Sequence, residues 1–360
     1  MVSRKVMVIV FFALGLFNAC QDKEGIEQAG GLQIIRIEHD NQTELFLEDV
    51  AANYTSIPLE MTEESLIGYI DNIAVSENFI YVNHAKGILQ FNHAGKYIKN
   101  IGENGEAPGN YRQVRSMIID PADQSIVVTD YVLRKSLKFN ENGKLLAESE
   151  SLSSPPIFIA PIPEGYVIIT DDIIKDENSS ILSINNFFIQ DREFVKLDSL
   201  KPIMSKVESF GGSIWRHPSF ITRSDSINFL FFPIGPFNEQ IVRDTLFQIN
   251  QNGDFIPHLK FQFSENVINE EGKRVFFIEK MEVNEAYYLV TYHYEGNYYL
   301  FGYDRKKGNS WLVKDGLRVK NLEGYYLPKS NGISYLMTEG VSEIKGEEPN
   351  PMIHLIDWGK

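Results

Sequence analysis

The chain has 360 residues, with 34 Lys and Arg, 49 Asp and Glu and a single Cys. Residues 1–19 hold Arg4 and Lys5 but no acidic residue, so their removal leaves 32 basic and 49 acidic residues, a net charge of −17. This charge opposes binding to nucleic acid or anionic lipid, which need clustered cations, and one Cys excludes a disulfide framework or a multi-cysteine metal site.

The amino terminus has the features of an export signal. Arg4 and Lys5 precede an apolar run from Val6 to Phe17, and small Ala19 precedes Cys20. Twelve helical residues span about 18 Å, less than the roughly 30 Å of a bilayer core, so the run is a secretory signal rather than a membrane anchor. We therefore expect a signal peptide over residues 1–19.

Cys20 follows the signal where bacterial lipoproteins carry their acylated cysteine. The Ala19-Cys20 ending resembles their lipobox, although Phe17 stands where Leu is usual. We predict lipidation at Cys20; the alternative is an ordinary signal peptide with a chance cysteine. Residues 20–42 are then expected to form a lipidated flexible tether, because residues 21–31 are polar and contain glycine. The acidic Q-D-K-E after Cys20 resembles a surface-export signal of Bacteroidetes lipoproteins, which implies an outer-membrane lipoprotein at the cell surface or on the periplasmic face.

The rest of the chain repeats with a period near 48 residues. F-N-H-A-G-K at residues 91–96 recurs as F-N-E-N-G-K at 139–144, with degenerate copies at 187–191, 249–254 and 303–308. Each copy is predicted to be a strand, a tight turn and another strand. Asn142-Gly143 and Asn252-Gly253 are predicted type I′ hairpin turns, since both turn positions need positive φ.

A run rich in Ile, Val, Tyr and Phe precedes each turn, and there are six such runs: residues 78–83, 124–130, 165–170, 227–232, 286–292 and 332–337. Four strands in each unit of about 48 residues are typical of a propeller blade, although a solenoid would also repeat. We therefore predict an all-β fold over residues 43–360, a six-bladed β-propeller of four-stranded antiparallel blades. An N-terminal strand, Glu44–Leu47 or Tyr54–Leu59, is expected to close the ring in the last blade, beside Met352–Trp358.

Three segments carry a resemblance to a known family. They are I-P-L-E-M-T-E-E-S-L-I-G-Y-I-D-N-I at residues 57–73, the segment from Ile88 to Tyr111, and R-D-T-L-F-Q-I-N-Q-N-G-D-F-I-P-H-L-K-F at residues 243–261. Together they resemble the six-bladed β-propeller lipoproteins of Bacteroidetes, which are related to NHL-repeat propellers. The family's G-x-G-P-G-E-Y element stands here as residues 105–111, with Ala107 and Asn110 substituted. The resemblance covers roughly residues 45–355 and implies fold and envelope location, but little chemistry.

The sequence contains no phosphate-binding loop, no G-x-S-x-G nucleophile, no H-E-x-x-H helix and no EF-hand loop. We therefore expect no cofactor and no metal site. The acid pairs Glu63-Glu64, Asp171-Asp172 and Glu270-Glu271 are candidates for metal binding or acid–base chemistry, but such pairs are more often solvated loop residues.

Propellers bind ligands at one mouth of the central channel, lined by the crossovers between blades and by the loops joining second and third strands. Aromatic faces stack on sugars and Arg pairs with carboxylates. The alternative is that the aromatic residues pack between blades and the Arg residues bridge loops. The candidate ligand-binding residues are Tyr111, Arg112, Arg115, Tyr131, Arg134, Trp215, Arg216, His217 and His293.

Two classes of function remain. The first is an envelope-anchored binding or scaffold module for a glycan, a peptide or an outer-membrane partner protein, with no nucleic-acid partner. The second is a propeller enzyme of lactonase, polysaccharide lyase or glycoside hydrolase type. A lactonase needs three or four Glu, Asp or Asn side chains that converge on a cation from different blades, and no such register is evident. The binding module is therefore favoured.

Overall fold

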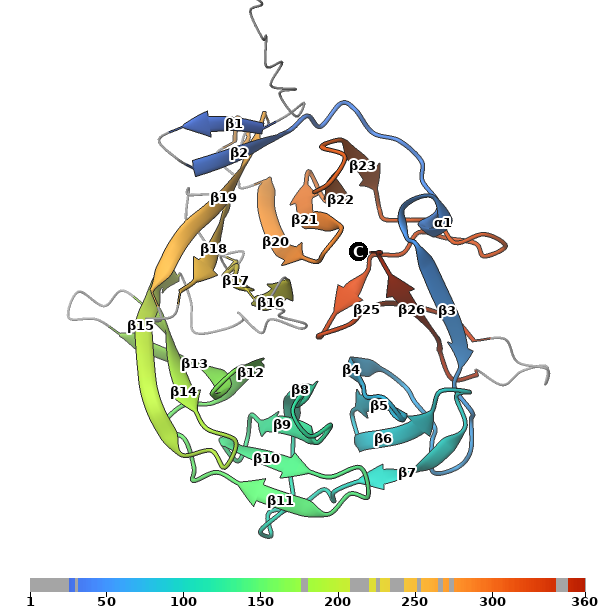
Figure 1. The fold of residues 1–360 in the computed structure, drawn as a ribbon, viewed down its shortest axis with the longest axis vertical. Helices are drawn as coiled ribbons and strands as arrows, with labels where there is room; N and C mark the ends of the chain where they lie inside the picture. Colours follow the sequence, from blue (N-terminus) through green and yellow to red (C-terminus); the bar gives the residue numbers. More distant parts are fainter. Residues whose placement is uncertain are drawn as a thin grey trace, which may run out of the picture.

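A computed structural model describes residues 26–29, 32–175, 181–207, 220–224, 227–233, 243–250, 254–264, 268–271, 275–340 and 349–359. Their strands form six sheets arranged radially about a common axis (Figure 1). The six-bladed all-β propeller predicted from the repeat is therefore confirmed. Within the described residues, the one α-helix is α1 (Leu47–Val50), which packs Leu47 and Val50 into the core.

Blades 1, 2, 3 and 5 are each built from four consecutive antiparallel strands. From the axis outward these are β4 (Ile70–Val75), β5 (Phe79–His84), β6 (Gly87–Asn92) and β7 (Tyr97–Ile101) in blade 1; β8 (Val114–Ile119), β9 (Ile126–Asp130), β10 (Lys135–Phe139) and β11 (Leu145–Glu148) in blade 2; β12 (Pro156–Ile162), β13 (Gly165–Lys175), β14 (Ile181–Gln190) and β15 (Lys196–Val207) in blade 3; and β20 (Phe276–Val283), β21 (Tyr287–Tyr294), β22 (Asn297–Asp304) and β23 (Ser310–Lys314) in blade 5.

Blade 6 joins the two ends of the chain. It contains β24 (Lys329–Ser330), β25 (Ser334–Thr338), β26 (Met352–Asp357) and, as its outer strand, β3 (Asn53–Pro58). β3 runs antiparallel to β26, with Ile57 opposite Ile353. Closure by an N-terminal strand is thus confirmed for the second of the two candidate segments. The first lies instead beside the connection from blade 5 to blade 6, where Phe46 forms a bridge with Arg318.

Blade 4 has two strands more than predicted. β16 (Ile221–Ser224), β17 (Ile227–Leu230), β18 (Thr245–Ile249) and β19 (Phe255–Phe263) are extended by β2 (Leu32–Ile37), which runs parallel to β19, and then by β1 (Ile26–Ala29). Ile35 and Ile37 of β2 are each 1% exposed. The tether predicted over residues 20–42 is therefore too long, because β2 belongs to the fold. Residues 1–25, which include the predicted signal peptide and Cys20, lie outside the described residues.

The repeated sequence element is the hairpin between the third and fourth strands of a blade. In blade 2 the Asn140 side chain accepts the backbone N–H groups of Asn142 and Lys144, and in blade 1 Asn92 does the same for Ala94 and Lys96. The type I′ turn predicted at Asn142-Gly143 is wrong, since only the glycine has positive φ, at 75°. The asparagine side chain, rather than a mirror-image turn, reverses the chain. Asn252-Gly253 lies outside the described residues.

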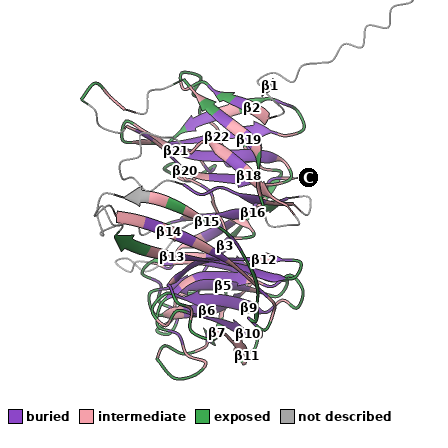
Figure 2. Cartoon of the chain, turned by 90° about the vertical axis from the view of Figure 1, so that its left-hand side faces the viewer, coloured by how far each residue is buried: buried purple, intermediate pink, exposed green. Residues whose placement is uncertain are grey.

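The core lies between blades rather than within any one of them. Tyr81 of blade 1 packs in one buried cluster with Met117 and Phe139 of blade 2, each at most 1% exposed. Figure 2 shows buried strands in successive layers through the molecule. Because each blade buries its faces only against its neighbours, the ring needs all six blades and its closing strand.

Candidate functional site

A cavity of about 210 Å³ lies at the propeller axis, where innermost strands of several blades meet. Asp71 and Arg115 are each the second residue of an innermost strand, β4 and β8, and Lys329 begins β24. Innermost strands begin where the crossovers from preceding blades arrive. The cavity is therefore at the channel mouth that the sequence analysis singled out.

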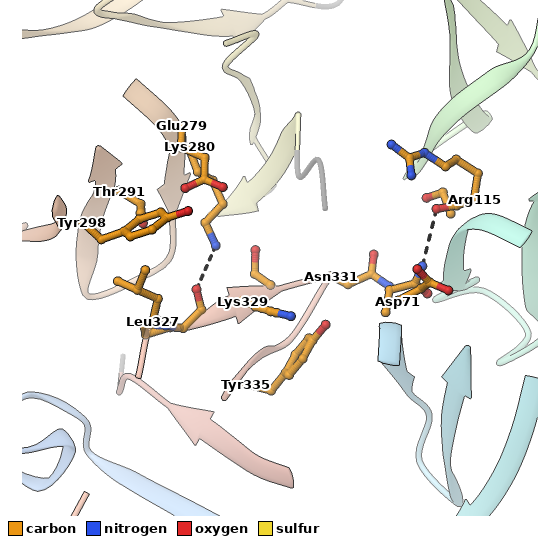
Figure 3. A pocket seen from close by; sticks show the side chains of 14 residues that line it. Asp71, Arg115, Glu279, Lys280, Thr291, Tyr298, Leu327, Lys329, Asn331 and Tyr335 are labelled. Carbon is orange, nitrogen blue, oxygen red and sulfur yellow. Dashed lines mark hydrogen bonds between the residues drawn. The ribbon is translucent and has the colours of Figure 1, made fainter. Parts of the chain in front are cut away.

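Three cationic side chains from three blades line this cavity, which we call the mouth cavity (Figure 3). Lys280 of β20 is fixed: its Nζ donates to the Pro328 carbonyl oxygen at 3.0 Å and lies 2.7 Å from Glu282 Oε2. Among the described residues, the Arg115 guanidinium and the Lys329 ammonium make no hydrogen bond and no ion pair within 4 Å. Two partly buried cations are thus left without a directly bound counter-ion.

Three charged groups of the mouth cavity are partly buried, and burial shifts the pKa of each of them. Burial lowers the pKa of the Arg115 guanidinium, an effect that Asp71 partly offsets. Burial and the like charge of Lys280 lower the pKa of Lys329. Burial raises the pKa of the Asp71 carboxyl, although both cations oppose that change. An anion bound to Arg115 and Lys329 would stabilise the charged form of both cations and would offset the repulsion between Lys329 and Lys280.

Aromatic side chains form one wall of the mouth cavity. Tyr298 of β22 lines it and is 40% exposed. Its ring centroid lies 3.6 Å from that of His293, which stacks on Phe277 at 4.3 Å and an interplanar angle of 13°. His293 Nε2 also lies 3.4 Å from a carboxylate oxygen of Glu279. His293 is therefore placed behind the cavity wall, where it supports Tyr298 and Glu279.

Of the nine predicted ligand-binding residues, Arg115 lines the mouth cavity. Tyr131 is 39% exposed and lies close enough to Arg115 to raise the pKa of its guanidinium, against the effect of burial. Arg112 and Arg134 do not line it: Arg112 pairs with Glu106 at 2.5 Å, and Arg134 donates to the Ser153 carbonyl oxygen at 3.1 Å. Arg134 thus bridges two loops, as the alternative interpretation had it, whereas the Arg112 pair lies within a single crossover. Three further predicted residues, Trp215, Arg216 and His217, lie outside the described residues.

The structure assigns Tyr111 to packing rather than to ligand contact. Its side chain is 2% exposed, and its hydroxyl donates to the Ile101 carbonyl oxygen at 2.7 Å and accepts the Ile88 N–H at 3.1 Å. A Cβ on Gly102, whose φ is +67°, would lie 2.7 Å from the Tyr111 ring. The glycine–tyrosine element that carries the family resemblance therefore packs blade 1 against blade 2. The glycines beside Tyr111 make room for its buried ring and do not indicate a ligand-binding loop.

The acid pair Asp171-Asp172 does not form a site. Neighbouring residues of a strand point to opposite faces, and each carboxylate is occupied: Asp171 accepts from Ser183 and Asn185, and Asp172 accepts from Ser154 and Asn186. Across the described ranges, no group of three or more His, Cys, Asp and Glu side chains is placed to hold a metal ion. The carboxylate cluster that a lactonase needs is not found in that part of the chain.

The sequence matches one protein family over residues 32–348, described as a domain of unknown function, DUF4934. The chain belongs to this family. The DUF4934 match begins at Leu32, the first residue of β2, which agrees with the placement of β2 in the fold. A search of curated proteins found no match. No described helix is long and apolar enough to cross a membrane.

Solved structures similar to this DUF4934 protein include two proteins from Bacteroides species. A protein of Bacteroides fragilis, described as a candidate exported protein, shares 15% identity over 91% of this chain and 100% of its own, with a TM-score of 0.62. A protein of unknown function from Bacteroides caccae shares 14% identity over 68% of this chain and 81% of its own, with a TM-score of 0.40. The first likeness shows a shared fold, and the second carries no further argument.

The sequence analysis missed four charged residues of the mouth cavity, Asp71, Glu279, Lys280 and Lys329, as well as Tyr298. The four charged residues lie in innermost strands, whereas the predicted ligand-binding residues were taken from crossovers and loops. A signal was present, because Lys280 and Glu282 are charged residues two apart in a strand and so share one face. Charges on one face of an innermost strand indicate a polar channel wall.

Proposed function

We propose that this DUF4934 protein is a binding module of the cell envelope, and that its mouth cavity binds an acidic sugar of a glycan. The observation that carries the proposal is the pair of partly buried cations, Arg115 and Lys329, without direct counter-ions among the described residues. A carboxylate would accept two parallel hydrogen bonds from the Arg115 fork and a further charge-assisted bond from Lys329.

The neighbouring aromatic wall favours a sugar over a free inorganic anion. Tyr298 offers a partly exposed ring beside the cations, and His293 and Phe277 stack behind it to hold its position. Sugar rings stack on such faces through their C–H groups, while their carboxylate reaches the cations. The volume of about 210 Å³ is small, which suits one terminal or side-branch residue of a glycan rather than a long segment.

The binding test compares three single variants on the same ligands. We expect wild-type protein to bind galacturonic or glucuronic acid oligosaccharides in calorimetry, and to bind the matching neutral oligosaccharides much more weakly. Arg115→Ala should weaken binding about ten- to 100-fold, because a hydrogen bond to a charged group contributes about 1.5–3 kcal/mol. Lys329→Ala should have a similar effect.

Arg112→Ala is the matched control, since Arg112 lies in the crossover that leads into β8, close to Arg115 in sequence, but pairs with Glu106 on the surface. It should bind as wild type does. Equal loss in Arg112→Ala, or unchanged affinity in both Arg115→Ala and Lys329→Ala, would contradict the site. Release of shorter or unsaturated sugars during incubation would instead support the lyase or hydrolase alternative.

Envelope anchoring is the second part of the proposal, and it rests on the export signal and on Cys20. The structurally similar Bacteroides fragilis protein is also described as exported by its name. We expect Cys20→Ser to move the protein from the membrane fraction to the soluble fraction, without acyl chains by mass spectrometry. Its melting temperature should not change, because Cys20 precedes the first strand. A Cys20→Ser protein that is still acylated and still sediments with membranes would overturn the assignment.

A further inference from the structure

A second and larger cavity, of about 440 Å³, lies at the opposite end of the channel from the mouth cavity, where innermost strands end. All six blades contribute to its wall, from Val75 of blade 1 to the loop between β24 and β25 of blade 6. Asn331 of that loop lines both cavities, and its side-chain amide donates to the carbonyl oxygens of Ile73 and Met117. We call this second space the lower cavity.

Most of the lower cavity wall is apolar. The apolar side chains that line it include Ile118, Ile119, Phe158, Ala160 and Val283. Ligand pockets in proteins are typically about 300–1,000 Å³ and mainly apolar, with a few polar groups that set the orientation of the ligand. The lower cavity therefore has the size and the wall of a site for a small apolar molecule, and its polar groups select the head group of that molecule.

Arg223 is the one cation among the described residues that line the lower cavity. It lies two residues after Ile221 in β16 and so on the same face of the strand, and Ile221 packs with Phe158 of blade 3. The Arg223 side chain is exposed and makes no hydrogen bond and no ion pair in the part of the chain that the structure describes. Its guanidinium is therefore free to receive an anion beside the apolar space.

Glu282, the other ionisable residue of the described wall, does not present its charge to the lower cavity. Its Oε1 is fully buried, and its Oε2 lies 2.7 Å from Lys280 Nζ. The residue as a whole is 6% exposed. No carboxylate of the described wall therefore competes with an anionic ligand for Arg223.

Two amide side chains of the wall have their oxygen atoms occupied. Asn284 Oδ1 accepts two backbone N–H groups of the turn that follows it, at 2.9 Å and 2.7 Å, and Gln124 Oε1 accepts the Glu77 N–H at 3.2 Å. The NH₂ groups of both amides make no hydrogen bond among the described residues. Each amide therefore offers a donor, and not an acceptor, to a ligand that reaches it.

We propose that the lower cavity binds an apolar carboxylic acid in its ionised form, with the carboxylate on Arg223 and the hydrocarbon part against the apolar wall. A carboxylate accepts two parallel hydrogen bonds from a guanidinium, and it has further lone pairs for the amide donors. An ammonium head would meet a like charge at Arg223, and a hydroxyl head would leave that charge without a counter-ion. A phosphate head would bring up to two negative charges, for which the described wall holds a single cation.

The test compares octanoate with 1-octanol, octylamine and acetate by NMR titration of the protein. The first three probes share one chain length and differ in the head group, whereas acetate keeps the carboxylate and lacks the apolar tail. We expect octanoate to bind at least tenfold more tightly than each of the other three. The proposal is overturned if octanoate does not bind, or if any of the other probes binds as tightly.

Single variants locate the bound octanoate. Arg223→Ala should weaken octanoate at least tenfold, to the affinity of 1-octanol, because it removes the cation and keeps the apolar wall. Ile119→Trp should abolish octanoate binding, because it enlarges a partly buried residue of the wall into the cavity. Lys260→Ala is the matched control, since Lys260 is a cation on β19 of the same blade, 40% exposed and paired with Asp244. It should bind octanoate as wild type does.

Arg115→Ala separates the lower cavity from the mouth cavity, and it should leave octanoate affinity unchanged. The proposal is overturned if Arg115→Ala rather than Arg223→Ala removes octanoate binding, if Lys260→Ala weakens it as much as Arg223→Ala, or if Ile119→Trp leaves it unchanged. Thermal melting checks that each variant folds; if Ile119→Trp does not, Arg223→Ala and the order of the four probes decide. Because octanoate carries no sugar ring, failure here leaves the acidic-sugar proposal for the mouth cavity standing.

Discussion

Removing residues 21–60 is expected to prevent the propeller from closing and to cause aggregation. The deletion takes away β3, which pairs with β26 along six residues, from Asn53 opposite Asp357 to Pro58 opposite Met352. The backbone N–H and C=O groups of β26 would then form an open edge, the template for pairing with other chains. It also removes β2 and α1, whose buried side chains Ile35, Ile37, Leu47 and Val50 fill the outer core.

A single substitution in β3 tests closure without a large deletion. Ile57 is 2% exposed and packs with Ile353, Ile73 and Phe91 between blades 6 and 1. Ile57→Ala should cost about 2–5 kcal/mol of unfolding free energy, since it removes buried methyl groups and leaves a cavity. Thr55→Ala, at an exposed position of the same strand, is the control and should cost much less.

Chemical denaturation measures both variants, and deletion of residues 21–31 is the control for the large deletion. That shorter deletion removes only β1, the outermost strand, which pairs with β2 alone. It should leave a soluble, cooperatively unfolding protein. If deletion of residues 21–60 gave an equally stable monomer, or if Ile57→Ala cost no more than Thr55→Ala, closure by β3 would not be what holds the ring together.

The fold could be predicted because its signals are local. The Asn140–Lys144 hairpin and its copies depend on an Asn or Asp side chain that folds back on its own backbone, so each copy is visible in a few residues. β2 could not be predicted in this way. Its partner β19 is more than 200 residues away, and only that pairing makes Ile35 and Ile37 core residues.

The candidate site was harder to predict because it exists only in the closed ring. Arg115 could be found, since it lies at a crossover rich in Gly, Tyr and Arg. The spacing of Lys280 and Glu282 indicates a polar strand face, but nothing in the local sequence of Lys280 or Lys329 shows that β20 and β24 meet β8 at the axis. Tyr111 was misassigned for the converse reason: a tyrosine beside glycines looks the same whether it stacks on a ligand or fills the space over Gly102.

The seam between blades 2 and 3 is held by a buried charge network centred on Asp120, whose side chain is 0% exposed. Lys138 Nζ and Arg192 Nε lie 3.3 Å and 3.2 Å from its Oδ2, and the Tyr166 hydroxyl donates to the same oxygen at 2.6 Å. Asp120 and Lys138 belong to blade 2, Tyr166 and Arg192 to blade 3. Burial, and then the bond to Asp120, raise the pKa of Tyr166. One carboxylate thus satisfies three donors from two blades.

Asp120→Asn is therefore expected to cost at most about 3–5 kcal/mol of unfolding free energy, because it removes the buried anion that Lys138 and Arg192 face, while Lys138 keeps its ion pair with Asp123 at 2.8 Å. Tyr166→Phe should cost about 1.5–3 kcal/mol, the value of one hydrogen bond to a charged group.

Glu106→Gln is the control: it breaks the exposed pair with Arg112, and such surface pairs contribute about 0–1 kcal/mol. Denaturation in low and high salt separates the two cases further, because buried pairs are screened much less than exposed ones. If Asp120→Asn cost no more than Glu106→Gln, or if 1 M NaCl removed the difference, the network would not be holding this seam. The two blades would then be joined mainly by the apolar contacts of Ile118, Ile159 and Ile168.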